Sequence, residues 1–172
     1  MKKWLLVLGV ISWMGVNAQN EFAANAFIDA LRSMYLDGQN GFLLSKGNKI
    51  PVDSNSFTDE YYLKTEFPMS DSGKLVWPLV NNPYAVLYME PSRKREDAEA
   101  RAGNLRAVIE KAGGLVLYAR SESQLEGSHY FADTFFYTDP AETRKFMAIY
   151  RISVFYNKGK YKLLLEIRGR KP

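Results

Sequence analysis

Apolar residues recur at helical spacing in the first part of the chain. Between Glu21 and Leu36 they fall at every third or fourth position and form one stripe, which predicts an amphipathic helix. Asn20 is a suitable N-cap. Asp37-Gly38 provides a stop, because glycine readily takes the left-handed conformation that ends many helices. The stripe consists of Ala23, Ala26, Phe27, Ala30, Leu31 and Met34.

A second helix is predicted from Ser92 to Ala112, with Ser92 as its N-cap and Gly113-Gly114 as its stop. Its apolar residues are spaced by four, three, four and three positions, and three of the five are alanine. Such a stripe of small residues allows a helix to lie close against a sheet. The five residues are Ala98, Ala102, Leu105, Ile109 and Ala112.

Alternation of apolar and polar residues from Glu60 to Phe67 predicts a strand with one face in the core and one in water. Tyr61 belongs to the core side and Tyr62 to the wet side. The run from Tyr84 to Met89 is apolar at every position, which predicts a strand buried on both faces.

Shorter strands are expected nearby. Phe42–Ser45 and Ile50–Val52 are predicted as strands around a tight turn at residues 46–49. The run Leu75–Leu79 contains Pro78, which belongs at a sheet edge or in a bend because proline cannot donate to a strand ladder.

The C-terminal part is predicted to be β-structure, and its last two strands form a hairpin. A two-residue turn at Lys158-Gly159 sets Arg151 opposite Glu166 on one face. The register that pairs these charges also pairs apolar residues on the other face, and this agreement between two levels favours the hairpin. The predicted strands are Leu115–Ala119, His129–Tyr137, Phe146–Tyr156 and Tyr161–Arg168; the apolar pairs are Tyr156 with Tyr161, Val154 with Leu163, Ile152 with Leu165 and Tyr150 with Ile167.

This order of elements predicts an α+β protein. We expect a predominantly antiparallel sheet with a C-terminal meander, covered by two main helices. Both halves begin with a helix and continue as strands, so a duplicated helix-plus-strands unit is a further hypothesis, although the halves share no matching residues. Short linkers favour a single domain over residues 19–172.

The first 18 residues have the layout of a secretory signal peptide. Lys2 and Lys3 precede an apolar run of 13 residues, and Val16-Asn17-Ala18 forms a small-residue cleavage site. The run is well short of the ~20 residues that a membrane-spanning helix needs. We therefore expect an exported protein, periplasmic or extracellular, with no stable membrane insertion after cleavage.

Composition narrows the function classes. The chain has no cysteine, so disulfides, thiolate nucleophiles and lipidated cysteines are excluded. The formal charge is +4 and falls to +2 without the two lysines of the signal peptide, which is too small to indicate a polyanionic partner such as a nucleic acid. The charge is uneven, however: residues 19–91 carry 5 basic and 9 acidic side chains, and residues 92–172 carry 16 and 10. This asymmetry indicates either an anion-facing surface or two solvated faces of unequal charge.

No catalytic, metal or cofactor site is predicted. His129 is the only histidine, and in a strand Asp133 would lie about 13 Å from it, beyond hydrogen-bond reach. The segment Asp53–Asp59 resembles a calcium loop only weakly, because Thr58 stands where glycine is needed. Acidic residues remain as candidates for hydrolase chemistry, although nothing in the sequence brings two of them together. They are Asp53, Asp59, Glu60, Glu66 and Asp71.

The start of the second helix breaks a rule of helix electrostatics. Arg93, Lys94 and Arg95 lie where the helix dipole disfavours cations, although Glu96 and Asp97 partly compensate. Free backbone N–H groups beside three cations could bind an anion. A solvated first turn, neutralised by its own acidic residues, explains the same pattern.

Aromatic residues provide a second candidate surface. The chain has 11 tyrosines and 10 phenylalanines, and Tyr62 and Phe155 fall on predicted wet faces. Together with Arg93–Arg95 they are the candidate site. The expected function is that of a small, non-enzymatic binding protein that holds a protein partner or a small anionic ligand. The alternatives are a small hydrolase that uses carboxylates and a homo-oligomeric structural subunit that assembles through strand edges.

Overall fold

The computed structural model describes residues 25–52, 56–64, 66–113, 116–125, 130–138 and 149–171, with the backbone alone for residues 111–113 and for most of residues 116–138. The protein is α+β, as predicted. Its eight strands form one sheet in which every pair of neighbours is antiparallel.

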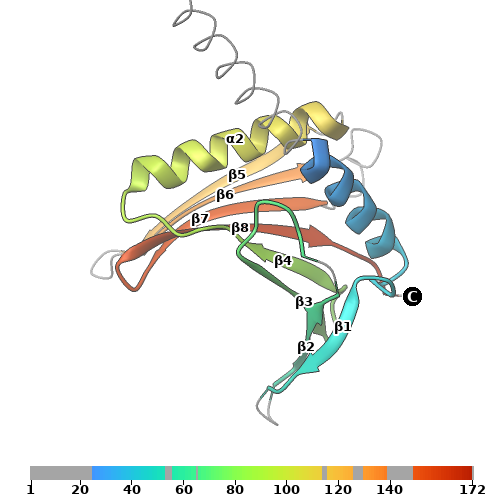
Figure 1. Cartoon of the computed structure of the whole chain (residues 1–172). Coiled ribbons are helices and arrows are strands. Elements are labelled where there is room, and N and C mark those ends of the chain that lie inside the picture. The colour runs from blue at the N-terminus through green and yellow to red at the C-terminus, as the bar shows by residue number, and fades with distance from the viewer. Residues whose placement is uncertain are drawn as a thin grey trace, which may run out of the picture.

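The first half of the chain is a helix followed by a four-stranded meander (Figure 1). The helix covers residues 25–39, and its predicted start at Glu21 lies outside the described residues. It runs on through Asp37 and Gly38, past the predicted stop. The strands are β1 Lys46–Ile50, β2 Thr58–Leu63, β3 Ser72–Pro78 and β4 Tyr84–Tyr88.

The second half repeats this order. Helix α2 covers Arg95–Gly113 and begins three residues after Ser92, whose Oγ accepts a hydrogen bond from the backbone N–H of Lys94. Four strands follow as a meander. They are β5 Val116–Leu125, β6 Tyr130–Thr138, β7 Tyr150–Asn157 and β8 Lys160–Arg168.

The two meanders join through their last strands. The sheet order is β1-β2-β3-β4-β8-β7-β6-β5, so β4 pairs with β8, and β1 and β5 form the two edges. From either edge inward, four consecutive strands of one unit lie side by side in chain order. In the sequence, each set of four strands comes directly after a helix. The duplicated helix-plus-strands unit proposed from the sequence is therefore present as a repeat of topology.

The C-terminal hairpin has the predicted register. Arg151 lies opposite Glu166, and all four predicted apolar pairs are formed. Lys158 and Gly159 both have positive φ, 48° and 80°, as a two-residue turn between twisted strands requires.

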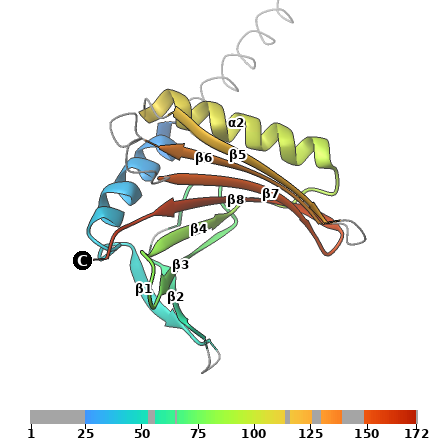
Figure 2. The same ribbon diagram turned by 180° about the vertical axis from the view of Figure 1, so that it is seen from behind.

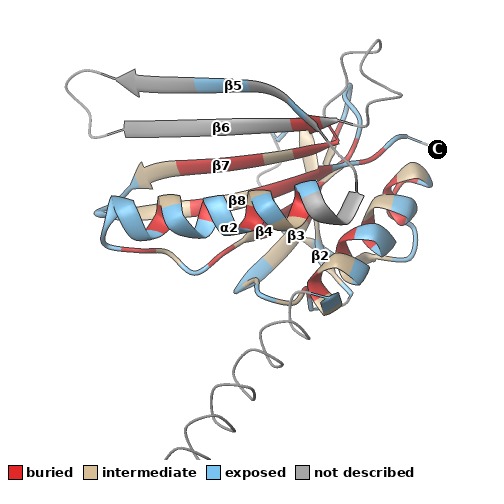
Figure 3. Cartoon of the chain, turned by 90° about the horizontal axis from the view of Figure 1, so that it is seen from above, coloured by how far each residue is buried: buried red, intermediate tan, exposed pale blue. Residues whose placement is uncertain are grey.

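Both helices pack on the same face of the sheet. The sheet bends so that β1–β3 turn away from the plane of β5–β8, and the helices lie on the outer side of that bend (Figures 1 and 2). The buried residues of α2 recur between exposed ones (Figure 3) and join a single core with the N-terminal helix and both meanders. All four predicted stripe residues of α2 whose side chains are described, Ala98, Ala102, Leu105 and Ile109, are buried, and the side chain of Ala112 lies outside the described part.

The prediction of two strands around a turn at residues 46–49 is wrong, because those residues are strand β1 and residues 41–45 are the turn. The buried Asp37 carboxylate determines this arrangement. It accepts hydrogen bonds from the backbone N–H groups of Leu44 (3.0 Å) and Ser45 (2.7 Å). Phe42 takes a left-handed conformation with φ 57° and is fully buried. These contacts depend on the folded N-terminal helix and are not visible in local residue spacing.

Pro78 is the last residue of β3, an interior strand between β2 and β4. The chain bends directly after it, at residues 79–81. Of the two predicted placements, the bend is therefore correct and the sheet edge is not.

Candidate functional site

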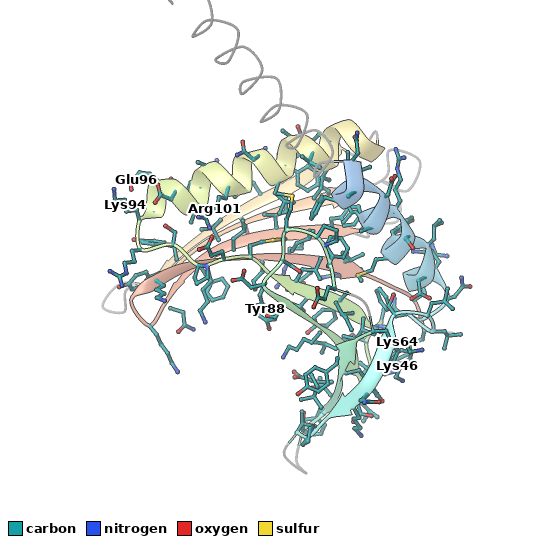
Figure 4. All side chains as sticks on the ribbon, in the orientation of Figure 1. Lys46, Lys64, Tyr88, Lys94, Glu96 and Arg101 are labelled. Carbon is teal, nitrogen blue, oxygen red and sulfur yellow. The ribbon has the colours of Figure 1, made fainter. Side chains whose placement is uncertain are left out.

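The candidate site is the face of the sheet that lies away from the two described helices. Residues paired across antiparallel strands point to the same face. One row of pairs crosses five strands, from Tyr62 through Lys74, Val86 and Glu166 to Arg151. Figure 4 shows Tyr88 on this side of the sheet, opposite to α2. We call the surface the open face; its described side chains are Thr58, Glu60, Tyr62, Ser72, Lys74, Val76, Tyr84, Val86, Tyr88, Arg151, Ser153, Phe155, Lys162, Leu164, Glu166 and Arg168.

A lysine bridges two neighbouring strands at one side of the open face. Lys74 Nζ lies 2.6 Å from Glu60 Oε1, and both side chains are largely buried. Burial lowers the pKa of Lys74, but hydrogen bonds to Glu60 and Tyr88 outweigh that effect, and the net shift is upward. Lys74 therefore stays charged and holds the Glu60 carboxylate and the Tyr88 hydroxyl in place.

A second ion pair lies at the middle of the open face. The Arg151 guanidinium donates through Nη2 to Glu166 Oε1, and the Glu166 side chain is only 10% exposed. Burial raises the pKa of Glu166, although the charges of Arg151 and Arg168 oppose the shift. Burial and the charge of Glu166 also raise the pKa of Tyr84. The Nε atom of Arg151 is buried without a hydrogen-bond partner, so this pair is not fully satisfied.

The open face carries more cations than acids among its described residues. Its two carboxylates, Glu60 and Glu166, are each paired with one cation. Lys162 and Arg168 form no ion pair with a described residue. The surplus positive charge lies beside one exposed ring, that of Tyr62, and three half-buried rings, those of Tyr84, Tyr88 and Phe155, and this combination suits an acidic and partly apolar surface.

Further cations gather where α2 begins. The backbone N–H and C=O of Ser92 bond to those of Tyr161, at 2.9 and 2.8 Å, and this bridge sets the start of α2 beside the start of β8. The exposed cations that follow Ser92 thereby join those of the β7–β8 hairpin. We call this cluster the basic end; it comprises Arg93, Lys94, Lys158, Lys160 and Lys162.

The structure brings together some of the candidate residues and separates others. Arg93 and Lys94 belong to the basic end, and Phe155 is paired with Lys162 of the same end. Arg95 lies 2.6 Å from Glu99 and is partly neutralised by it. Tyr62 is 55% exposed and lies on the same open face, but on β2, four strands away from Phe155 in the sheet order.

Several open-face residues were missed from the sequence. The prediction of a strand buried on both faces is correct for its central residues 85–87, but Tyr84 and Tyr88 at its ends are only half-buried and point to the open face. The signal was present, because tyrosines at alternate positions around Val86 combine an apolar ring with a hydroxyl that needs a polar partner. Lys74, Lys162 and Arg168 carried no such signal, since their position depends on which strands pair.

Two of the acidic candidates for hydrolase chemistry, Asp59 and Glu60, both in the described part of the chain, pair with different lysines. Asp59 pairs with Lys49 at 2.6 Å, and Glu60, the next residue, points to the opposite face and pairs with Lys74. Asp53 and His129 lie outside the described residues. In the described part of the chain, no three His, Cys, Asp or Glu residues are grouped to hold a metal ion, and no helix is long and apolar enough to cross a membrane.

Comparison with models of known protein families and with curated protein sequences finds no match to this chain.

Proposed function

We propose that this protein is an exported, non-enzymatic binding protein that holds an acidic partner protein against its open face and basic end. The observation that carries the proposal is the open face itself. The two described helices cover one side of the sheet (Figure 1), while the other side carries tyrosines, a phenylalanine and, among its described residues, more cations than carboxylates. Tyrosine, phenylalanine and arginine side chains are enriched at protein interfaces, and charged groups at the rim steer a partner of opposite charge.

The charge pattern indicates the charge and polarity of the partner's binding surface. The basic end adds Arg93, Lys94, Lys158 and Lys160 to the surplus cations of the open face. A partner with carboxylates at its rim and an apolar centre would complement both surfaces. Such charges act mainly on the association rate and on the choice of partner, and apolar contacts supply most of the affinity.

Charge reversal at the basic end tests the proposal. The variant Lys160→Glu/Lys162→Glu is expected to weaken partner binding at least tenfold, because it replaces attraction by repulsion at the rim. Its matched control is Lys64→Glu/Lys171→Glu, which changes the net charge equally at two exposed lysines outside both surfaces. The measurement is capture of partner proteins from the native cell envelope, followed by affinities of the recovered complex.

One partner that is retained by the control and lost by the test variant would support the proposal. Equal recovery with both variants would contradict it. Recovery that falls equally in both would indicate a general charge effect and would also contradict the proposal.

A further inference from the structure

A half-open cavity of about 270 Å³ lies on the helix-covered side of the sheet, distinct from the open face. Met89 and Leu163 form its floor, and Leu105 and Val108 of α2 form one wall. Phe27 and Met69 face them from the N-terminal helix and the loop after β2. These six of the nine lining residues are apolar, and the cavity volume is slightly below the ~300–1,000 Å³ that is usual for small-molecule sites.

The polar groups of the cavity are confined to its mouth. Arg101 and Asn104 precede Leu105 and Val108 by one turn on the same side of α2, because residues three and four apart are neighbours on a helix. Arg101 extends from α2 toward the segment that follows β4 (Figure 4). An apolar cavity with a few converging polar groups at its mouth is the usual form of a small-molecule site.

The guanidinium of Arg101 is held in position by one backbone hydrogen bond and can still bind a carboxylate. Its Nη1 donates to the backbone carbonyl of Glu90 at 2.9 Å, which fixes the side chain across the mouth. The Glu90 carboxylate is farther away, at 3.4 Å, and its side chain is 72% exposed. A second carboxylate could therefore replace that of Glu90, and the planar guanidinium suits a carboxylate.

The opposite rim combines a fixed backbone with an adaptable side chain. Met69 has φ 63°, a conformation that non-glycine residues rarely adopt, and its side chain is 66% exposed. The loop is anchored by Phe67, which is buried and packs edge-to-face on Phe27 with ring centroids 5.2 Å apart. Methionine adapts readily to apolar ligands of different shapes, so this rim can close over a flexible chain.

We propose that this cavity binds a short aliphatic carboxylate, with the alkyl chain among the apolar side chains and the carboxylate on Arg101. The cavity accommodates one short chain, and the cation at its mouth selects a negatively charged head group. A free fatty acid and the acyl end of a larger acidic molecule share this chemistry.

Methionine-methyl NMR of the purified protein, with octanoate as the probe, tests the proposal. Met69 and Met89 line the cavity, whereas Met34 is buried in the core and does not line it. Octanoate is expected to shift the methyl signals of Met69 and Met89 in a saturable way and to leave that of Met34 unchanged. Octylamine, which is positively charged at neutral pH, is expected to bind at least tenfold more weakly than octanoate.

Two variants of α2 separate the two parts of the site. Arg101→Gln is expected to lower the affinity for octanoate about tenfold, because a charge-assisted hydrogen bond is lost. Asn104→Trp, at an exposed position, blocks the mouth and is expected to abolish binding without disturbing the core. Lys64→Gln removes an exposed cation that does not line the cavity and lies outside the open face and the basic end, so it should leave the affinity unchanged.

Three results would overturn the proposal. The first is that octanoate, below the concentration at which it forms micelles, shifts neither the Met69 nor the Met89 methyl signal. A cavity filled by another part of the chain would give this same result. The second is equal affinity of octanoate for Arg101→Gln and the unmodified protein. The third is equal affinity of the protein for octylamine and octanoate.

Discussion

Replacing Gly169 with alanine is expected to destabilise the protein by about 2–3 kcal/mol, the upper part of the ~1–3 kcal/mol range for an overpacked core. A Cβ atom at this position would lie 2.4 Å from Cε2 of Phe42 and 2.6 Å from the carbonyl oxygen of Gly38. Phe42 cannot move aside, because it is fully buried and its backbone is held in the left-handed region. The neighbouring Arg170 N–H also donates to the Gly38 carbonyl, so the two backbones are tied together.

Gly103→Ala is the matched control. A Cβ atom at Gly103 would have no neighbour within 4 Å, and the residue is exposed in the interior of α2. Alanine is the better helix former, so this variant should be more stable by up to about 1 kcal/mol. Urea unfolding followed by circular dichroism measures both. If Gly169→Ala unfolded at the same urea concentration as the unmodified protein, the close packing of the C-terminal segment against the N-terminal helix would be wrong.

Removal of Arg151, the arginine at the centre of the open face, is expected to cause the second large loss of folding stability. Arg151→Met is expected to cost about 2–3 kcal/mol at pH 7, because it leaves Glu166 buried without its partner. The value is set below that for a fully buried pair because the Arg151 side chain is 34% exposed. The double variant Arg151→Met/Glu166→Leu should recover most of the loss, since it removes the buried charge together with its partner.

The pH dependence distinguishes this explanation from simple loss of packing. The pKa of Glu166 is raised in the folded protein above the ordinary value of 4.5, so the folded state binds its proton more tightly than the unfolded state. This contribution to stability is complete below pH 4.5 and is lost as the pH rises through the folded pKa. Without Arg151 that pKa rises further. The deficit of Arg151→Met should therefore be large at pH 7 and small at pH 4, and an equal deficit at both values would contradict the ion-pair account.

The sequence predicts the fold wherever local pattern and pairing agree. The β7–β8 hairpin has the predicted register because one alignment satisfies the turn, the apolar pairs and the charge pair together. The region around β1 was predicted incorrectly because its turn depends on Asp37, a side chain at the end of the preceding helix. Propensity and spacing contain no information about a side chain that bonds to the backbone seven and eight residues further along the chain.

The candidate site was predictable only in part, for a similar reason. Alternation along β2 identifies Tyr62 as exposed, and the hairpin register places Phe155 on the face of Arg151. The joining of β4 to β8 creates the middle of the open face, and no local pattern predicts which strands of the two units meet. The proximity of Arg93 to the β7–β8 hairpin likewise depends on the Ser92–Tyr161 bridge.

Site-specific photo-crosslinking tests the central claim most directly. A photoreactive phenylalanine analogue would be placed at Tyr88 or Phe155 on the open face, and at Ala107 on the exposed side of α2 as the control. Irradiation in the native cell envelope is expected to join one and the same partner protein to both open-face positions and none to Ala107. Crosslinks to a partner from Ala107 alone, or no crosslink from either open-face position, would contradict the account that the open face is the binding surface.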